Sequence, residues 1–534
     1  MLSGLKTTYS SNKRSTPDLL LISFFLYNFA MDFIKKHKAL LLFGLGISIL
    51  YILTRLYNIM SLPIFTDEAI YVRWAQIANN DANWRFISLV DGKQPSFVWA
   101  MMVVMRLIDD PLLAGRLVSV IAGLVSIIGL FFLGREVFKN TWIGITTAFL
   151  YVLYPMALVY DRMALYESLV GAFTVWSLYL TVVLIRKMQL DTALILGLII
   201  GGGVLTKTSA FFSIYLLPIS LILFDFKRKE MYPKFFKWAG LAVLSTIIAY
   251  GIYSILRLSP FFHIIDEKNA LFVYPLSEWI EHPFRFWYGN ILGEWDWMWR
   301  YMTIFGIGLI LLSFFIDRKF LREKIFLFVW FLVPFLALAV FGKTLYPRFI
   351  FFMTLALLPL IAFSVFKIKG FIKNKILLSG IFALLLYFPL SSGYKILNNF
   401  SEAQIPDLDL EQYSNGWTSG AGVKEVVEFL EKEAKDKKIF VGTQGTFGLM
   451  PYALELYLVD NKNITINGFW PIDETIPKKL DEVRKQIPTY VLFYQPCSIC
   501  KSIGTPPALW PVTLVSSYRR GIGATYLSLY RVNP

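Results

Sequence analysis

The sequence has little charge, few cysteines and no nucleotide-binding signature. Only 17% of its 534 residues are charged while 56% are hydrophobic, which is too apolar for a soluble protein of ordinary surface-to-volume ratio. Its two cysteines, Cys497 and Cys500, are too few for a disulfide framework that holds the fold together. Neither a Rossmann GxGxxG fingerprint nor a P-loop occurs. The composition predicts a protein that resides in lipid.

The net charge of +15 does not indicate nucleic-acid binding. No basic stripe interleaved with aromatic residues appears on a soluble segment, so nucleic acid is not expected as a partner. Instead, the basic residues form short clusters between apolar runs, which is the positive-inside pattern of membrane proteins.

Apolar runs of the length that crosses a bilayer recur along the chain. About 20 apolar residues span the hydrocarbon as a helix, and the runs predict about eleven spans. They lie near residues 39–57, 113–134, 141–160, 168–185, 192–206, 209–224, 236–256, 301–316, 325–341, 346–366 and 376–391. The fold class expected is therefore a polytopic α-helical membrane protein.

The distribution of lysine and arginine predicts the orientation. Every second connection is basic, and basic loops stay on the cytoplasmic side. These connections carry Lys35, Lys36 and Lys38; Arg135 and Lys139; Arg186 and Lys187; Lys227, Arg228 and Lys229; Arg318, Lys319, Arg322 and Lys324; and Lys367, Lys369, Lys373 and Lys375. We expect a multi-pass plasma-membrane protein with a cytoplasmic N-terminus. Segments 58–112 and 257–300, and everything after about residue 392, then face outward.

The first 30 residues form a separate N-terminal segment. They are a twelfth span, a surface helix, or the product of an over-long gene model whose true start is Met31. The last interpretation is favoured because MDFIKKHK followed by an apolar run is the usual opening of a signal-anchor helix.

After the last predicted span, the pattern becomes that of a small alternating α/β unit. Helical periodicity at 423–433, 447–458 and 478–486 alternates with β-rich runs at 438–443, 463–469, 489–494, 511–517 and 524–530. The expected domains are a transmembrane domain over 31–392 and an extracytoplasmic α/β domain over 393–534.

The first outer loop carries an acidic pair and a lysine. Asp67 and Glu68 open an amphipathic helix in FTDEAIYVRWAQIA, where they act as N-terminal caps or as catalytic carboxylates. Lys93 precedes a short apolar helix of the kind that lies at the membrane interface, where its ammonium binds a lipid phosphate or snorkels to water. This loop is expected to hold interfacial helices.

Further basic residues follow at the other outer connections. Arg162 and Glu167 lie in YDRMALYES, Lys207 ends a glycine-rich span, and GKTLYPRFIFF holds the remaining three candidates Lys343, Tyr346 and Arg348. Singly, each basic residue is more often a solvated flank of a span. Their convergence with Lys93 on one outer face, against the positive-inside trend, predicts an anionic partner there.

These motifs together resemble the C-type glycosyltransferase superfamily, in particular the branch of protein O-mannosyltransferases and lipid A aminoarabinose transferases. The matching pieces are TDEAIYVRWA, GKQPSFVW, RLVSVIAGLVSIIGLFFLGREVF, YPMALVYDRMALYESLVGAF, GGGVLTKTS and KTLYPRFIF. They cover about residues 60 to 365 in the expected order. Where the family usually has a Lys-Pro-Pro segment, the second proline is Ser96 here.

The resemblance implies the roles of the candidate residues. Asp67 corresponds to the catalytic carboxylate, a general base on the acceptor hydroxyl, with Glu68 supporting it or contacting the acceptor. Lys93 corresponds to the phosphate-binding lysine. Lys207, Tyr346 and Arg348 correspond to further contacts to donor phosphate or sugar, and Arg162 and Lys343 are candidates for the same role. Glu167 occupies the position of a second acidic residue, which binds the sugar, the acceptor or a metal.

The resemblance also implies the reaction. A sugar passes from a polyprenyl-phosphate donor to an acceptor on the extracytoplasmic side, with inversion, and serves glycosylation of the cell envelope. The acceptor is a protein, a glycan or a lipid, and membrane lipids are further partners. A transporter or flippase of a lipid-linked sugar is the alternative, although transporters tend to show inverted repeats and charged sites at the midplane. A third hypothesis, a scaffold whose outer α/β domain binds a partner, explains neither the acidic pair nor the cations of the outer face.

Two pairs of residues outside these motifs need an interpretation. His263 and His282 lie near acidic residues and are weak candidates for a divalent metal, although interfacial histidines without metal are more common. No cofactor is otherwise predicted. Cys497 and Cys500 form a local disulfide on the outer face in the leading interpretation, and a thioredoxin-like site in the less favoured one.

Overall fold

A computed structural model describes residues 38–226, 230–283 and 285–534. Predictions about segment 1–30, the start at Met31, the lysines at 35 and 36, and the basic cluster 227–229 lie outside the described residues. The chain divides into two compact units, Met1–Leu50 and Tyr51–Pro534. All packing described below is within the second unit.

Eight helices within the described residues are long and apolar enough to cross a membrane. They are Lys38–Leu56, Pro111–Phe138 (α4), Tyr166–Lys187 (α7), Met231–Leu258 (α10 with η5), Trp287–Ile316 (α13), Leu321–Phe341 (α14), Pro347–Phe371 (η6 to α16) and Lys375–Asn398 (α17). Three shorter apolar helical segments are Thr141–Leu153 (α5), Leu190–Val204 (α8) and Thr208–Leu223 (η3 to η4). All eleven predicted runs are helical, and the polytopic fold is confirmed, while the number of true spans stays a prediction.

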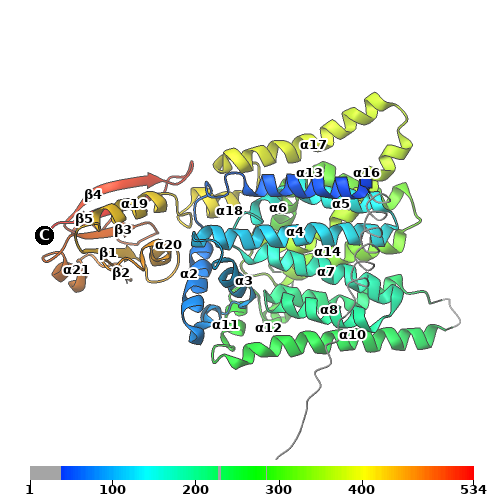
Figure 1. The fold of residues 1–534 in the computed structure, drawn as a ribbon, viewed down its shortest axis with the longest axis horizontal. Helices are drawn as coiled ribbons and strands as arrows, with labels where there is room; N and C mark the ends of the chain where they lie inside the picture. The colour runs from blue at the N-terminus through cyan, green and yellow to red at the C-terminus, as the bar shows by residue number, and fades with distance from the viewer. Residues whose placement is uncertain (1–37, 227–229, 284) are drawn as a thin grey trace, which may run out of the picture. The chain divides into compact units, whose positions relative to one another are not determined.

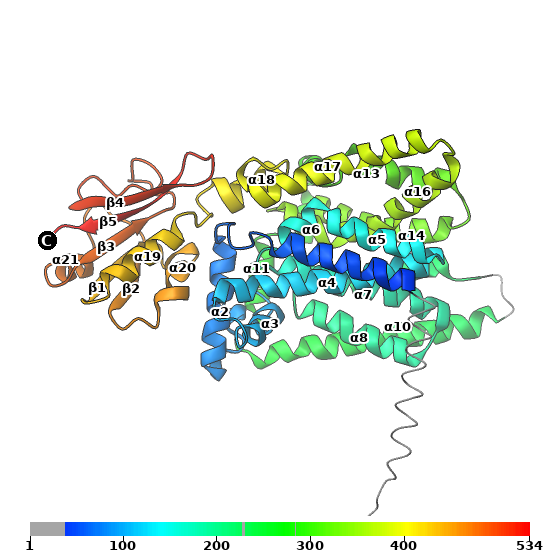
Figure 2. The same ribbon diagram turned by 45° about the horizontal axis from the view of Figure 1, so that its top comes forward.

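Small residues let these helices approach closely. α8 and α10 lie side by side in both views of the chain (Figures 1 and 2). A Cβ built on Gly197 would lie 2.8 Å from Ile248, and one built on Gly201 would lie 2.4 Å from Ile252. Glycines four residues apart are the usual way in which membrane helices make a tight contact without a hydrophobic driving force.

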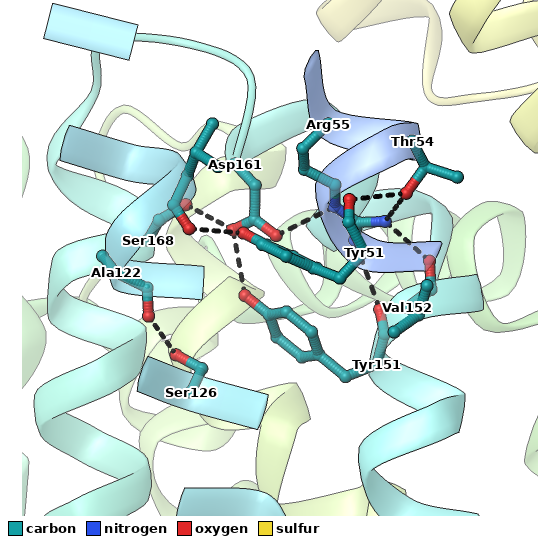
Figure 3. Close-up of polar contacts among 10 residues, drawn as sticks. Tyr51, Thr54, Arg55, Ala122, Ser126, Tyr151, Val152, Asp161 and Ser168 are labelled. Carbon is teal, nitrogen blue, oxygen red and sulfur yellow. Dashed lines mark hydrogen bonds and ion pairs between the residues drawn. The ribbon is translucent and has the colours of Figure 1, made fainter. Parts of the chain in front are cut away.

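A buried ion pair ties the end of the first described helix to the turn before α7. Arg55 Nε lies 3.3 Å from Asp161 Oδ2, and both side chains are fully buried. Tyr151 and Ser168 donate hydrogen bonds to the other oxygen of Asp161, and Figure 3 shows how these groups enclose the carboxylate. Asp161 is therefore a structural residue of the bundle.

The connections between the long helices carry short helices. The connection before α4 contains α2 (Thr66–Asn80), η1 (Ala82–Trp84), η2 (Ile87–Asp91) and α3 (Ser96–Val104), and the connection between α10 and α13 contains α11 (Ile264–Ala270) and α12 (Leu276–Glu281). α6 (Pro155–Tyr160) lies between α5 and α7, whereas η8 (Phe400–Glu402), α18 (Asp407–Leu410) and η9 (Glu411–Asn415) follow α17. That α2 and α3 lie at a membrane interface stays a prediction.

The C-terminal part forms the predicted α/β unit around a five-stranded sheet of order β2-β1-β3-β5-β4. Its strands are β1 (Ile439–Gln444), β2 (Ile464–Phe469), β3 (Thr489–Phe493), β4 (Val512–Arg519) and β5 (Tyr526–Val532), with helices α19 (Val423–Glu433), α20 (Leu449–Leu458) and α21 (Lys478–Val483). β1 is parallel to β2 and β3, whereas β5 is antiparallel to β3 and β4. Each predicted helix and strand of this unit is present. Cys497 and Cys500 are joined in a disulfide.

Candidate active site

A cavity of about 470 Å³ opens where α2, α11, α14, η6 and the starts of α3 and α7 meet. Its polar wall contains Tyr71, Lys93, Gln94, Tyr166, Glu167, Lys207, Lys268 and Arg348. The apolar part of its wall contains Phe211, Phe212, Pro334, Leu338, Phe341, Phe349 and Phe352. The cavity thus combines several cations with an apolar wall that a hydrocarbon chain would fit.

Asp67 lies next to this cavity, in the first turn of α2. Its Oδ2 is 2.9 Å from Nη1 of Arg348, whose side chain is 11% exposed. Burial alone would raise the pKa of Asp67, but the charges of Arg348 and Lys93, together with hydrogen bonds from Arg348 and Tyr71, hold the pKa below its ordinary value. Asp67 is therefore a carboxylate at neutral pH, while its partners Tyr71 and Arg348 form part of the cavity wall.

Lys93 differs from the other lysines of the cavity. It follows Gly92, whose φ of 64° lies in the left-handed region that glycine tolerates. Its ammonium lies 5.4 Å from the ring centre of Phe272 and, within the described chain, has no ion pair or hydrogen bond. Burial lowers the pKa of Lys93 to about 8, against the opposing effect of Asp67. A partly buried ammonium that lines a cavity and has no carboxylate in hydrogen-bond contact is a site for an anion.

Two more lysines of the cavity are paired with carboxylates. Lys207 Nζ lies 2.7 Å from Oε1 of Glu167 and 4.8 Å from the ring centre of Phe349. Lys268, from α11, lies 2.6 Å from Oδ1 of Asp91. Lys268 was not predicted, because it follows Asp266 and Glu267 and has no basic neighbour that would signal an anion site.

Tyr346 lies beside the cavity rather than in its wall. It precedes η6 (Pro347–Ile350), and its ring meets that of Phe349 edge to face at 5.6 Å. The guanidinium of Arg348 lies 5.1 Å from the ring centre of Tyr346. Tyr346 therefore supports two residues that line the cavity.

Ser96 connects the two turns that carry Lys93 and Lys207. Its backbone N–H donates to the carbonyl of Leu205 at 3.1 Å, and its hydroxyl lies 2.6 Å from that of Thr206. Gln94 adds a hydrogen bond of 2.8 Å to the hydroxyl of Thr208. Proline, which has no N–H, could not make the first of these bonds, so the departure from the family's second proline has a structural use here.

Glu68 faces away from the cavity. Its oxygens accept hydrogen bonds from Arg116, from the N–H of Phe65 and from the N–H of Ala164, and both charged side chains are fully buried. The predicted contact with an acceptor is not possible in this position. Glu68 instead caps α2 and holds it against α4, so the capping interpretation applies to Glu68 and not to Asp67.

Arg162 and Lys343 also lie outside the cavity wall. Arg162 is buried, and its two terminal nitrogens donate to the carbonyls of Tyr57, Asn58 and Ile396 within the bundle, whereas its Nε has no hydrogen-bond partner among the described residues. Lys343 is exposed, although its neighbour Gly342 lines the cavity. The prediction that these two residues contact the donor is therefore corrected to a structural role for Arg162 and a peripheral position for Lys343.

The two histidines do not form a cluster. His263 and His282 are both exposed, at the start of α11 and the end of α12. Among the residues described, no group of three or more His, Cys, Asp or Glu side chains has the arrangement of a metal site. A role for a divalent metal stays a prediction.

Comparisons with known proteins agree with this architecture. Residues 93–253 match a family model described as dolichyl-phosphate-mannose-protein mannosyltransferase. No curated protein matches the chain in sequence.

Two solved structures are similar in fold. The crystal structure of ArnT from Cupriavidus metallidurans bound to undecaprenyl phosphate has a TM-score of 0.55 at 11% identity, covering 93% of this chain and 98% of that one. The archaeal oligosaccharyltransferase AglB from Archaeoglobus fulgidus, in complex with an inhibitory peptide and a dolichol-phosphate, has a TM-score of 0.52 at 12% identity, covering 86% and 69%. The chain therefore has the fold of the C-type glycosyltransferase superfamily, as its ordered motifs predicted.

Proposed function

We propose that the chain is an integral-membrane glycosyltransferase that transfers a sugar from a polyprenyl-phosphate donor to an acceptor on the extracytoplasmic side. The observation that carries this proposal is the position of the unpaired Lys93 ammonium in a cavity that also has an apolar wall. A polyprenyl phosphate has the same two parts, an anionic head and a hydrocarbon tail. The relatives with solved structures were found with undecaprenyl phosphate and dolichol-phosphate, which supports this class of donor.

The cations stabilise the leaving group. When the bond between the anomeric carbon and the phosphate oxygen breaks, the electron pair stays on the phosphate and its negative charge increases. Lys93 and Arg348, already in place and shielded from water, stabilise that charge without reorganisation. Lys207 and Lys268 keep their carboxylate partners, and Lys207 contributes by holding Glu167 at the cavity wall, where it can contact the sugar.

Asp67 is the general base. It takes the proton of the acceptor hydroxyl as that oxygen bonds to the anomeric carbon, on the side opposite the departing phosphate. One displacement inverts the anomeric configuration. The lowered pKa keeps Asp67 ionised, and its ion pair with Arg348 places the base beside a residue that also faces the phosphate.

Replacement of Lys93 by alanine should weaken donor binding. A hydrogen bond to a charged group contributes about 1.5–3 kcal/mol, which corresponds to about a tenfold to a hundredfold rise in the dissociation constant. The measurement is titration of the purified protein with a short-chain polyprenyl-phosphate sugar. Lys343→Ala, which removes an exposed lysine outside the cavity wall, is the matched control and should bind as the wild type does.

Donor affinity should also depend on pH with a definite sign. The ammonium of Lys93 binds phosphate only when protonated, and its pKa in the free protein is about 8. Affinity is therefore full below that pH and falls as the pH rises above it. Lys93→Arg, which stays charged, should remove the decline between pH 7.5 and 9.5, and an unchanged decline in this variant would exclude Lys93 as its source.

The orientation in the membrane is part of the proposal. The alternation of basic loops places the N-terminus in the cytoplasm and the Asp67 site, with the C-terminal α/β unit, outside the plasma membrane. Labelling of single cysteines introduced at Trp84 and Lys319 in intact cells should modify the first position and spare the second.

Proteoliposomes distinguish the enzyme from the flippase alternative. Protein reconstituted with a donor labelled in its sugar, and with membrane extract as the source of acceptor, should move the label to the acceptor and release polyprenyl phosphate without added nucleotide. A flippase would move the intact donor between leaflets, and its label would stay on the lipid.

A further inference from the structure

The outer α/β unit is attached directly to the helix that carries Asp67. The N–H and the hydroxyl of Thr66 both donate to the carbonyl of Thr418, which lies just before α19. About two and three turns further along α2, Arg73 lies 2.9 Å from Glu455 and Gln76 donates to the carbonyl of Leu456, both on α20. The position of the outer unit relative to Asp67 is thus determined by polar contacts at both ends of the helix.

The edge of the sheet that meets α2 is the carboxyl edge of its parallel strands. The segment Gly445–Gly448 follows β1, and a Cβ built on Gly448 would lie 3.7 Å from Cγ2 of Thr66. Phe447 packs on Trp74, with ring centres 6.3 Å apart, and Trp74 lies on the same face of α2 as Asp67 because seven residues complete two turns. In open α/β sheets, ligands bind outside the carboxyl ends of the strands.

The same edge presents a hollow next to an exposed tryptophan. Trp470 directly follows β2, which is paired with β1, and its side chain is 55% exposed. A shallow, open hollow is lined by Trp470, Asp473, Thr475 and Asp481. Asp481 is already held by Arg484 and Lys485, whereas the carboxylate of Asp473 has no hydrogen bond or ion pair within the described chain.

These groups have the chemistry that recognises a sugar. A pyranose ring has an apolar face that stacks on an aromatic side chain, and hydroxyl groups at its rim that donate to a carboxylate or bond to a hydroxyl. Trp470 supplies the aromatic face, Asp473 the acceptor, and Thr475 a donor and acceptor. Phe447, which is 47% exposed and follows β1 at the same edge, adds an aromatic side chain in contact with Trp74 of α2.

We propose that the carboxyl edge of the outer sheet is a carbohydrate-binding site and that the acceptor is therefore a glycan chain. The chain is held at Trp470 and Asp473 while its end reaches Asp67. This inference rests on the proposed function, because it names the acceptor class of the same reaction. Trp470 and Asp473 are binding residues that lie outside the reacting centre.

The first test measures binding without any donor, so its result does not depend on catalysis. The probe is an array of manno-, gluco- and N-acetylglucosamine oligosaccharides of two to six units, applied to the full-length protein in nanodiscs. We expect binding to at least one series, and about a tenfold or larger loss for Trp470→Ala and for Asp473→Ala. The matched control is Trp84→Ala, which removes a tryptophan that is 42% exposed but not part of the hollow. Equal binding by all three variants, or no binding of any series by the wild type, would overturn the inference.

The second test measures transfer to oligosaccharides of the series that binds. Trp470→Ala should raise the KM for a six-unit acceptor about tenfold, with little change for a single-unit acceptor and an unchanged kcat. If transfer occurs but Trp470→Ala behaves as Trp84→Ala does, the acceptor site is wrong and the proposed function stands. If oligosaccharides bind through Trp470 but no donor is consumed, the proposed function fails.

Discussion

Asp67→Asn should reduce sugar transfer by about a hundredfold to ten-thousandfold, the usual contribution of a general base. Asparagine has nearly the same shape and still accepts a hydrogen bond from Arg348, but it cannot take the acceptor proton. Donor binding should stay within a few-fold of wild type because Lys93, the proposed contact to the phosphate, is unchanged. The measurement is initial-rate transfer at saturating donor.

The exposed aspartate of α11 provides the control for this variant. Asp266→Asn makes the same chemical change on the outer side of the protein, without contact to the cavity, and should transfer as the wild type does. Undiminished transfer by Asp67→Asn would remove Asp67 from the role of base.

Glu68→Gln should destabilise the fold, whereas Asp67→Asn should reduce transfer and leave stability close to wild type. Both variants replace a carboxylate by its amide. Glu68 and Arg116 are a fully buried ion pair, and removal of one charge leaves the other without a partner. Such a loss costs about 3–5 kcal/mol. We therefore expect a strong fall in the free energy of unfolding, measured by denaturant titration of the purified protein in detergent.

A double variant tests whether the instability comes from a buried unpaired charge or from the absence of the ion pair. Glu68→Leu combined with Arg116→Leu removes both charges and should be more stable than Glu68→Gln, because no unpaired charge stays buried. Asp67→Asn, whose carboxylate is 22% exposed, should unfold close to the wild type. Equal stability of Glu68→Gln and the wild type would contradict the structural role of Glu68.

The sequence could predict the helical runs because each is an apolar segment that must satisfy its own backbone in lipid. The sequence could not distinguish helices that cross the membrane from shorter apolar helices. α5 and α8 are too short to qualify as spans by length, and their continuation depends on packing against α4 and α10. The small α/β unit was predictable element by element, because its helices and strands differ clearly in hydrophobic period.

Three cationic residues of the candidate site could be predicted because their neighbours in the sequence indicate where they lie. Lys93 and Lys207 each lie in a turn before a short helix, and Arg348 precedes an apolar run, so convergence on one face follows from the alternation of the loops. The choice between Asp67 and Glu68 was not predictable. Successive residues of a helix point about 100° apart, so one carboxylate faces the cavity and the other faces Arg116, which is distant in sequence.

Tertiary structure keeps Arg162 out of the cavity wall and brings Lys268 into it. Arg162 has the sequence context of a ligand-binding cation, but its terminal nitrogens donate to backbone carbonyls at residues 57–58 and 396, which are distant in sequence. Lys268 lies in an acidic stretch, yet α11 packs over Gly92 and brings it into the cavity. Neither arrangement leaves a signal in the linear sequence.

The most direct measurement is the yield of polyprenyl phosphate when the purified protein is given a synthetic lipid-linked sugar, with and without acceptor. A glycosyltransferase releases one polyprenyl phosphate for each sugar transferred, requires no nucleotide, inverts the anomeric centre, and stops when Asp67 is replaced by asparagine. Donor that stays intact in the presence of every acceptor preparation, while it still crosses the bilayer of proteoliposomes, would contradict enzymatic transfer and identify a flippase.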